Sequence, residues 1–303
     1  MKFAVTGGAG FVGSHIVKKL ISDGHKVIVI DNLKTGKKEN LGKHADDVEF
    51  IQGDIRNYDL LKDSFRNVNG VFHQAALASV PDSFRIPDEY HDVNVNGTEN
   101  IFKLAAQDGF KVVYASSSSV YGNPVKIPIY EDHPKKPINP YAKTKLDDEG
   151  LAQKYASQGA KIIGLRYFNI FGEGQSRDYA GVIKKFLENI YNNMPPIVNG
   201  NGLQTRDFVY VEDVVRANLL AMESSVKHAF INIGTNSSIT ILELAEQIIK
   251  ISGLSLKIVH GPVLEGDIEQ SVADISLAKK LLNWEPKTTL NDWLKIAIPA
   301  KLN

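Results

Sequence analysis

Residues 6–13 read TGGAGFVG, and this stretch decides how the beginning of the chain folds. A short apolar run at 3–5 precedes it, and a stretch of helical periodicity at 11–22 follows it. Gly7, Gly10 and Gly13 allow a tight turn and a close approach of the backbone to phosphate groups at the positive end of the helix. The pattern therefore predicts a strand, a glycine-rich turn and a helix that together bind a dinucleotide.

Asp31 strengthens this interpretation by its position. It closes the second apolar run, eighteen residues after Gly13, where a carboxylate accepts hydrogen bonds from an adenosine ribose. Because a carboxylate there repels a 2'-phosphate, the sequence favours NAD over NADP. The alternative is a structural glycine turn followed by a turn-forming Asp-Asn pair. Asp54, after the third apolar run, is a candidate acceptor for the adenine amino group or, alternatively, a helix cap.

Short apolar runs alternate with helical patterns in the first half of the chain. The runs lie at 3–5, 27–30, 49–51, 71–72, 112–114 and 162–165, and the helical patterns at 11–22, 95–107 and 141–157. This order is typical of parallel strands with right-handed crossovers, so we expect an α/β fold with a Rossmann-type doubly wound parallel sheet.

Two domains are expected. Residues 1–167 form mainly the NAD-binding domain, and 168–303 form mainly a smaller α+β substrate-binding lobe, with some segments returning to the first domain. Helical patterns at 240–252 and 275–283 lie in this second half.

Composition narrows the class of protein. The 303 residues include 35 Lys and Arg against 35 Asp and Glu, so no global charge favours nucleic acid or an anionic membrane. The absence of cysteine excludes disulfides, thiolate metal sites and a cysteine nucleophile. We find no secretory signal and no apolar segment of membrane-spanning length, and we expect a cytoplasmic enzyme.

The segment NPYAKTK contains Tyr141 and Lys145, four residues apart on a predicted helix, so both side chains project from one face. A tyrosine hydroxyl ionises near pH 10, and a nearby positive charge is needed before it serves as a base at neutral pH. A single YxxxK match is more often structural than catalytic. The serine run SSSSVYG, which follows the fifth apolar run, adds hydroxyls at the edge of the sheet where such folds bind ligands, although serine runs are otherwise common in solvated turns.

These motifs together resemble the extended short-chain dehydrogenase/reductase family, most strongly its UDP-glucose 4-epimerase-like branch. The resemblance also includes DNL at 31–33, GDIR at 53–56, HQAA at 73–76, NVNGTEN at 94–100, RYFN at 166–169, TRDFVYV at 205–211 and VADIS at 272–276. It covers nearly the whole chain in order.

The resemblance implies specific residue roles. It implies a catalytic set of Ser117, Tyr141 and Lys145. It implies NAD-binding residues Gly7, Gly10, Phe11, Val12, Gly13, Asp31, Asn32, Asp54, Ile55, Ala75, Asn94, Tyr141, Lys145 and Phe168. It implies sugar-nucleotide contacts from Ser117, Asn169, Arg206 and Ser271.

Within this family, the residues after Ser117 favour epimerisation. Sugar-nucleotide 4,6-dehydratases place an Asp and a Glu there for the elimination of water, whereas this chain has Ser118 and Ser119. Oxidation and re-reduction at C4 of a UDP-hexose need only Tyr141 and bound NAD. The alternatives are a dehydratase, a net sugar-nucleotide oxidoreductase, or a regulator that binds NAD without turnover.

Several further expectations concern the sugar, metals and assembly. Leu264 stands where the family has an arginine that contacts the diphosphate, so Arg206 is the main candidate anchor, unless another basic group substitutes or the activating group is held differently. In the epimerases that this chain resembles, the position of Ser271 borders the C2 substituent of the sugar. The resemblance therefore implies that this small residue leaves room for N-acetylated hexoses, the alternative being that Ser271 is only a polar loop residue. His73 is interpreted as structural, and the spacing of the histidines predicts no metal site. The family resemblance suggests a homodimer formed by the helices at 95–107 and 141–157.

Overall fold

The computed structural model describes residues 1–175, 181–263 and 268–302, and at its centre is a seven-stranded sheet. The strand order is β11-β6-β5-β4-β1-β2-β3, and every neighbouring pair is parallel. The strands are β1 (Lys2–Thr6), β2 (Lys26–Asp31), β3 (Glu49–Gln52), β4 (Gly70–His73), β5 (Lys111–Ser117), β6 (Lys161–Tyr167) and β11 (His228–Ile233). The predicted α/β fold is confirmed.

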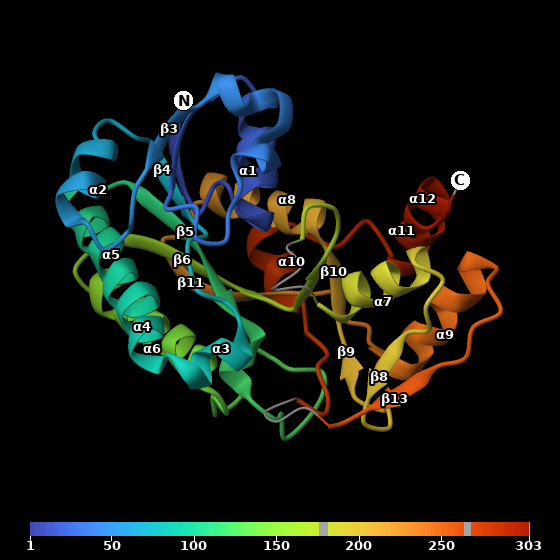
Figure 1. The fold of residues 1–303 in the computed structure, drawn as a ribbon. Helices are drawn as coiled ribbons and strands as arrows, with labels where there is room; N and C mark the ends of the chain where they lie inside the picture. The colour runs from blue at the N-terminus through green and yellow to red at the C-terminus, as the bar shows by residue number, and fades with distance from the viewer. Residues whose placement is uncertain (176–180, 264–267, 303) are drawn as a thin grey trace.

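The sheet carries helices on both faces (Figure 1). Alternate residues of each strand point to opposite sides, so Val5 and Val113 pack in one core cluster while Ala4 and Val112 pack in the other. The first cluster includes residues of α1 (Phe11–Ser22), α8 (Val211–Glu223) and α10 (Ser276–Leu282). The second includes residues of α2 (Tyr58–Ser64), α5 (Gly97–Asp108) and α6 (Pro140–Ala156).

The second half of the chain contributes to this sheet. The strand β11, which the sequence pattern did not predict, pairs in parallel with β6. Helix α10 packs on β11, and α8 packs on β5 and β6. The helix expected at 95–107 also differs, because a π-helical segment, η2 (His91–Asn96), precedes α5 without a break.

A smaller lobe lies beside the sheet and carries the end of the chain (Figure 1). Its core joins Phe171, Phe186, Leu244 and Leu294. Its helices are α7 (Val182–Tyr191), α9 (Ile241–Ser252), α11 (Leu290–Ala297) and α12 (Pro299–Leu302). Its short strand pairs are β7 (Asn169–Phe171) with β10 (Phe208–Tyr210), β8 (Ile197–Asn199) with β13 (Val259–Gly261), and β9 (Thr205–Arg206) with β12 (Ile239–Thr240). In the described part of the chain, no helix has the length and apolar character needed to cross a bilayer.

The strand order reverses direction next to β1, since β2 and β3 lie on one side of it and β4 on the other. In open parallel sheets, ligands bind outside the carboxyl ends of the strands at such a reversal. The loops that follow β1, β2, β4 and β5 are therefore the part of the fold where a site is expected.

Candidate active site

The glycine-rich loop after β1 is packed so closely that side chains are excluded. Gly7 has φ +67°, and a Cβ atom there would lie 2.6 Å from the backbone nitrogen of Ala75. A Cβ atom at Gly13 would lie 2.1 Å from the carbonyl oxygen of Gly7. Helix α1 begins after Gly10 without any side-chain cap, so its first N–H groups can bind a phosphate. The loop thus has the steric and electrostatic properties of a pyrophosphate cradle.

A narrow cavity opens at the carboxyl ends of β1, β2 and β4, beside this loop. Among the predicted cofactor residues, those that line it are Gly7, Gly10, Asp31, Asn32, Asp54, Ile55 and Ala75. Phe168 lines a neighbouring cavity that also contains the predicted substrate residues and is called the substrate cavity below, and Phe11 lines a separate hollow toward Trp293. Within the described residues, Val12, Gly13, Asn94, Tyr141 and Lys145 line neither of the first two cavities.

Asp31 is held in place by backbone donors. Its Oδ2 accepts from the N–H of Ala9 at 2.9 Å, and its Oδ1 accepts from the N–H of Leu33 at 2.8 Å. Burial raises the pKa of this carboxyl, and the two backbone hydrogen bonds oppose that shift. Each carboxylate oxygen accepts more than one hydrogen bond, so Asp31 keeps capacity for ribose hydroxyls.

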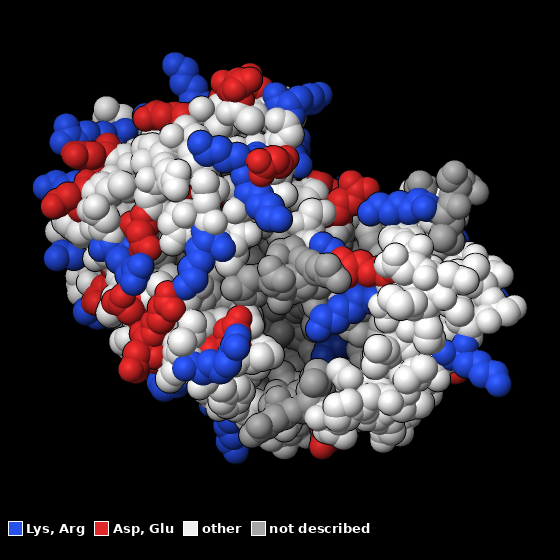
Figure 2. Space-filling view, in the orientation of Figure 1, with Lys and Arg blue, Asp and Glu red and all other residues white. Residues whose placement is uncertain are grey.

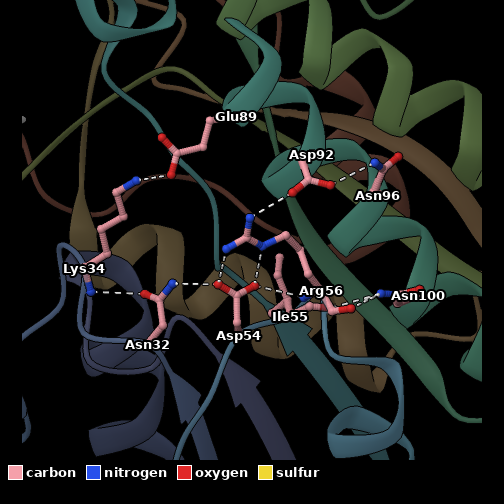
Figure 3. A network of polar contacts seen from close by, with 9 residues as sticks. All are labelled: Asn32, Lys34, Asp54, Ile55, Arg56, Glu89, Asp92, Asn96 and Asn100. Carbon is pink, nitrogen blue, oxygen red and sulfur yellow. Dashed lines mark hydrogen bonds and ion pairs between the residues drawn. The ribbon is translucent and has the colours of Figure 1, made fainter. Parts of the chain in front are cut away.

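A chain of polar contacts borders this cavity at the loops that follow β2 and β3 (Figure 3). Asp54 accepts from Arg56 Nε at 2.9 Å and Nη2 at 2.8 Å, and from Asn32 Nδ2 at 3.1 Å. Arg56 Nη1 in turn donates to Asp92 Oδ2 at 2.8 Å. Because hydrogen bonds from Arg56 favour the ionised form, the pKa of Asp54 falls to about 2.

Lys34 extends this chain of contacts from Asn32 to Glu89. Its backbone N–H donates to Asn32 Oδ1 at 3.0 Å, and its Nζ forms an ion pair with Glu89 of α4 (Pro87–Tyr90). Glu89 and Asp92 lie three residues apart on consecutive helical segments, so the loops after β2 and β3 are both tied to the same region of the chain (Figure 3). From the sequence, KTGKK at 34–38 was interpreted as a solvated loop and Glu89 was not singled out, because the two partners of the Lys34–Glu89 pair lie 55 residues apart.

The helix α6 carries the predicted catalytic pair. Asn139 caps its start by accepting from the N–H of Ala142 at 2.8 Å, and Pro140 occupies the first turn, where no N–H is needed. Tyr141 is half-buried, whereas Lys145 is only 3% exposed. The Nζ atom of Lys145 donates to Asp148 Oδ2 at 3.2 Å.

Asn94, predicted as a cofactor residue, ties this helix to the loop after β4. Its Oδ1 accepts from the N–H of Leu77 at 2.8 Å. Its Nδ2 donates to the carbonyl of Leu77 at 3.0 Å and to Thr144 Oγ1 at 3.0 Å. The Thr144 hydroxyl donates in turn to the carbonyl of Tyr141 at 2.8 Å. Both amide hydrogens of Asn94 are therefore used inside the protein, and its side chain fixes the helical turn that bears Tyr141.

A second cavity, of about 620 Å³, lies between the end of β5 and the smaller lobe. Figure 2 shows a hollow between the two parts of the molecule on this face, and among the described residues that line the cavity Arg206 is the only Lys or Arg. All four predicted substrate residues line it: Ser117, Asn169, Arg206 and Ser271. The Oγ atom of Ser117 accepts from the N–H of Ser119 at 3.2 Å and from its hydroxyl at 2.9 Å. Among the described lining residues, none is Asp or Glu.

Asp207 holds two walls of this cavity together. Its carboxylate accepts from the N–H of Thr235 at 2.8 Å, from the Thr235 hydroxyl at 2.6 Å, and from the N–H of Ala273 at 3.0 Å. Burial raises the pKa of this carboxyl to about 6. Since Asp207 follows Arg206 and Ala273 lies two residues after Ser271, this fully buried side chain fixes the spacing between these two predicted substrate residues.

Two other expectations concern His73 and Leu264. His73 is fully bonded, with Nδ1 2.7 Å from Thr6 Oγ1 and Nε2 2.8 Å from Thr98 Oγ1, and burial lowers its pKa to about 3. Its structural interpretation is confirmed. Leu264 lies outside the described residues. In the described part of the chain, no group of three or more His, Cys, Asp or Glu side chains could hold a metal ion.

Comparisons with known proteins agree with this geometry. The UDP-glucose 4-epimerase of Lactobacillus helveticus is 34% identical over 308 residues, which cover 95% of this chain and 92% of the relative. The UDP-glucuronic acid decarboxylase 1 of Arabidopsis thaliana is 36% identical and covers 97% of this chain and 68% of its own length. Sequence similarity of this degree therefore extends to more than one activity.

Solved structures match over the whole fold. The UDP-glucose 4-epimerase of Thermotoga maritima with UDP-glucose has a TM-score of 0.94 and 37% identity, and covers 99% of this chain and 98% of its own. The UDP-N-acetylglucosamine 4-epimerase of Methanobrevibacter ruminantium M1, in complex with UDP-N-acetylmuramic acid, has a TM-score of 0.93 and 36% identity, and covers 98% and 97%. The model of the NAD-dependent epimerase/dehydratase family matches residues 3–234. With its glycine-rich cradle, its Tyr141 and Lys145 on one helix and these similarities, the chain belongs to the NAD-dependent epimerase/dehydratase family, a branch of the extended short-chain dehydrogenases/reductases.

Proposed function

We propose that this enzyme interconverts the C4 epimers of a UDP-hexose. The observation that carries the proposal is the composition of the substrate cavity. Hydroxyl, amide and guanidinium groups line it at Ser117, Asn169 and Arg206, and among the described lining residues there is no carboxyl group. Removal of water from the sugar needs an added acid and base, whereas oxidation at C4 needs one base beside the cofactor.

The residues present fit NAD as the cofactor. The turn at Gly7 and Gly13 leaves no room for side chains, the uncapped start of α1 suits a pyrophosphate, and Asp31 keeps acceptor capacity for an adenosine ribose. When bound, NAD supplies a reversible hydride acceptor.

The protein side chains have three roles in the proposed reaction. Tyr141, as the phenolate, takes the proton of the sugar C4 hydroxyl, and Ser117 donates a hydrogen bond to the same oxygen. Lys145 supplies the positive charge that favours the phenolate. Reduction of the 4-keto sugar from its opposite face, with return of the proton from Tyr141, gives the epimer without net oxidation.

Arg206 and Asn169 are proposed to hold the diphosphate and the nucleotide. A guanidinium binds phosphate oxygens in a bidentate fashion, which suits Arg206 for the role of main cation in this cavity. The small Ser271, 5% exposed and lining the same cavity, leaves space beside the sugar for an acetamido group. We therefore include the UDP-N-acetylhexosamine pair among the proposed substrates.

The deciding experiment is product analysis from a panel of UDP-sugars without added cofactor. An epimerase returns a product of unchanged mass with an inverted C4 centre, as seen by mass spectrometry and NMR. Loss of water, loss of carbon dioxide or net oxidation would identify a dehydratase, a decarboxylase or an oxidoreductase instead. Binding of NAD with no product from any sugar would indicate a regulator.

A further inference from the structure

Asp148 is a buried carboxylate that the proposed mechanism does not use. It lies on α6, one turn after Lys145 and two turns after Tyr141, and its side chain is 0% exposed. Its Oδ2 accepts from Lys145 Nζ at 3.2 Å. Its Oδ1 has no hydrogen-bond partner among the described residues. A buried carboxylate that is bonded through only one oxygen is uncommon and calls for an explanation.

The charged groups around Asp148 single it out as the counter-ion of Lys145. Glu149, the next residue, is occupied by Arg166 of β6, with Arg166 Nε to Glu149 Oε1 at 2.7 Å and Arg166 Nη2 to Glu149 Oε2 at 2.8 Å. Asp147, the preceding residue, pairs with Lys143 at 2.5 Å on the protein surface. Each of the three adjacent carboxylates thus has its own cation, and Lys145 belongs to Asp148.

Two further titratable groups face this pair from the sheet. Tyr114 of β5 is fully buried, its hydroxyl also lacks a partner among the described residues, and the charges of Glu149 and Asp148 raise its pKa further above the value set by burial. His73 of β4 feels the charge of Lys145, although burial is the main cause of its low pKa. Both groups are therefore neutral near pH 7, and neither supplies a second charge to the pair.

Burial makes the ionised form of Asp148 costly. It raises the pKa of this carboxyl to about 7, against the attraction of Lys145, which acts in the opposite direction. Near neutral pH the carboxyl is therefore present in both its ionised and its protonated form, and the two forms leave different net charges beside Tyr141.

We propose that Asp148 is a positioning residue that orients Lys145 and sets how much of its positive charge acts on Tyr141. The inference rests on the proposed function, in which Tyr141 is the base. Ionised Asp148 neutralises Lys145, so the pair has no net charge. Protonated Asp148 leaves the full positive charge, which favours the Tyr141 phenolate.

The test is the pH profile of kcat for Asp148→Asn, which keeps the shape and removes the negative charge. With the carboxylate absent, the positive charge of Lys145 is no longer offset and favours the Tyr141 phenolate more strongly, so we expect the acidic limb of kcat at lower pH. One full charge removed at roughly 10 Å in an effective dielectric near 20 corresponds to about one pH unit. Because the carboxyl of Asp148 is only partly ionised near pH 7, the expected shift is about half a pH unit. A merely structural role would lower the plateau and leave the limb where it is.

Asp147→Asn is the matched control. It makes the same chemical change one residue earlier, at a surface ion pair, so its limb is expected to remain within a few tenths of a pH unit of the wild-type limb. If Asp148→Asn does not fold, Asp148→Ser, which is smaller and also neutral, is expected to show the same downward shift.

A second readout does not depend on turnover. Infrared difference spectra of the purified protein are expected to show a protonated carboxyl band that titrates near pH 7 and that Asp148→Asn removes. An unshifted acidic limb, or one that moves to higher pH, would overturn the proposal, as would the absence of that band. If the Asp148→Asn limb is unchanged while Tyr141→Phe is inactive, only the role of Asp148 fails. Normal turnover by Tyr141→Phe would refute the proposed mechanism and, with it, this role.

Discussion

Some residues of the site contact mainly their own turn, whereas others join segments that lie far apart in sequence. Gly7 and Gly13 exclude side chains because the backbone of the same turn and of the loop after β4 lies within 3 Å of any added Cβ atom. Asn94, by contrast, uses its whole amide group to join Leu77 and Thr144, and thereby fixes the helical turn of Tyr141. Residues with the same predicted role, cofactor binding, thus contribute to the site in different ways.

Tyr141→Phe tests the base directly. The ring and its packing remain, but the group that accepts the proton is lost, so we expect kcat to fall by at least about a hundredfold, the usual scale for a general base. The NAD content of the purified protein should change little. Steady-state kinetics together with cofactor release on denaturation would measure both effects, and near-normal turnover would remove Tyr141 from the mechanism.

Ser271→Tyr tests the proposed tolerance of N-acetylated sugars. An added ring beside the sugar is expected to clash with an acetamido group, and overpacking of this kind costs about 1–3 kcal/mol, or roughly five- to a hundredfold in the specificity ratio. The measurement is kcat/KM for UDP-N-acetylglucosamine relative to UDP-glucose, in the wild type and the variant. Rejection of N-acetylated sugars by the wild type, or an equal loss for both sugars, would contradict the idea.

At the scale of elements, loops that lie far apart in sequence are joined around the cofactor cavity. The loop after β2 reaches α4 through Lys34 and Glu89, and the loop after β3 reaches η2 through Arg56 and Asp92. Because Lys34 lines the cofactor cavity and its side chain is held by Glu89 (Figure 3), opening of this ion pair is expected to accompany cofactor release.

Glu89→Gln is therefore expected to accelerate NAD dissociation. An exposed ion pair contributes about 0.2–1 kcal/mol, so the expected increase is up to about fivefold, and added salt should reduce the difference from the wild type. Exchange of bound NAD against labelled NAD would measure it. Asp23→Asn is the control. The side chains of Lys19 and Asp23 are 48% and 35% exposed, close to the 42% and 38% of Lys34 and Glu89. The Lys19–Asp23 pair lies at the opposite end of α1 from the glycine loop. Equal effects of the two variants would argue against a specific role for Glu89.

At the scale of the whole molecule, the chain crosses between the sheet and the smaller lobe several times. After β6 it enters the lobe at β7, returns through α8 and β11, leaves again for α9, and comes back at α10. The substrate cavity lies between the two parts, and Asp207 connects segments from both sides of it. Such repeated crossing favours a stable relative position of the two parts.

The molecule as a whole is expected to keep its cofactor through many turnovers. In the proposed reaction the hydride is borrowed and returned, so purified protein should carry NAD or NADH in near-stoichiometric amount and act without an external reductant. Denaturation followed by chromatography of the released nucleotide would measure the content. Consumption of one added NAD(P)H per product would be incompatible with an epimerase.

Part of this organisation was determined by the sequence alone. Six strands of the sheet, helix α1 and helix α6 were predicted close to their observed bounds, because apolar periodicity and capping residues act within a few neighbouring positions. The spacing of Tyr141 and Lys145 likewise follows from the helical repeat. The glycine loop was recognisable because part of its steric requirement, the close approach of Gly13 to Gly7, arises within TGGAGFVG itself.

The tertiary structure decided the rest. Three sets of contacts join segments that are distant in sequence. They are the pairing of β11 with β6, the ion pair of Lys34 with Glu89, and the hydrogen bonds that Asp207 accepts from Thr235 and Ala273. Asp148 shows most clearly what the sequence cannot predict. Helical spacing places it on the face of Lys145 but does not reveal that its side chain is buried. Only the packing of α6 against the sheet removes that carboxylate from water, and this loss of hydration raises its pKa to about 7.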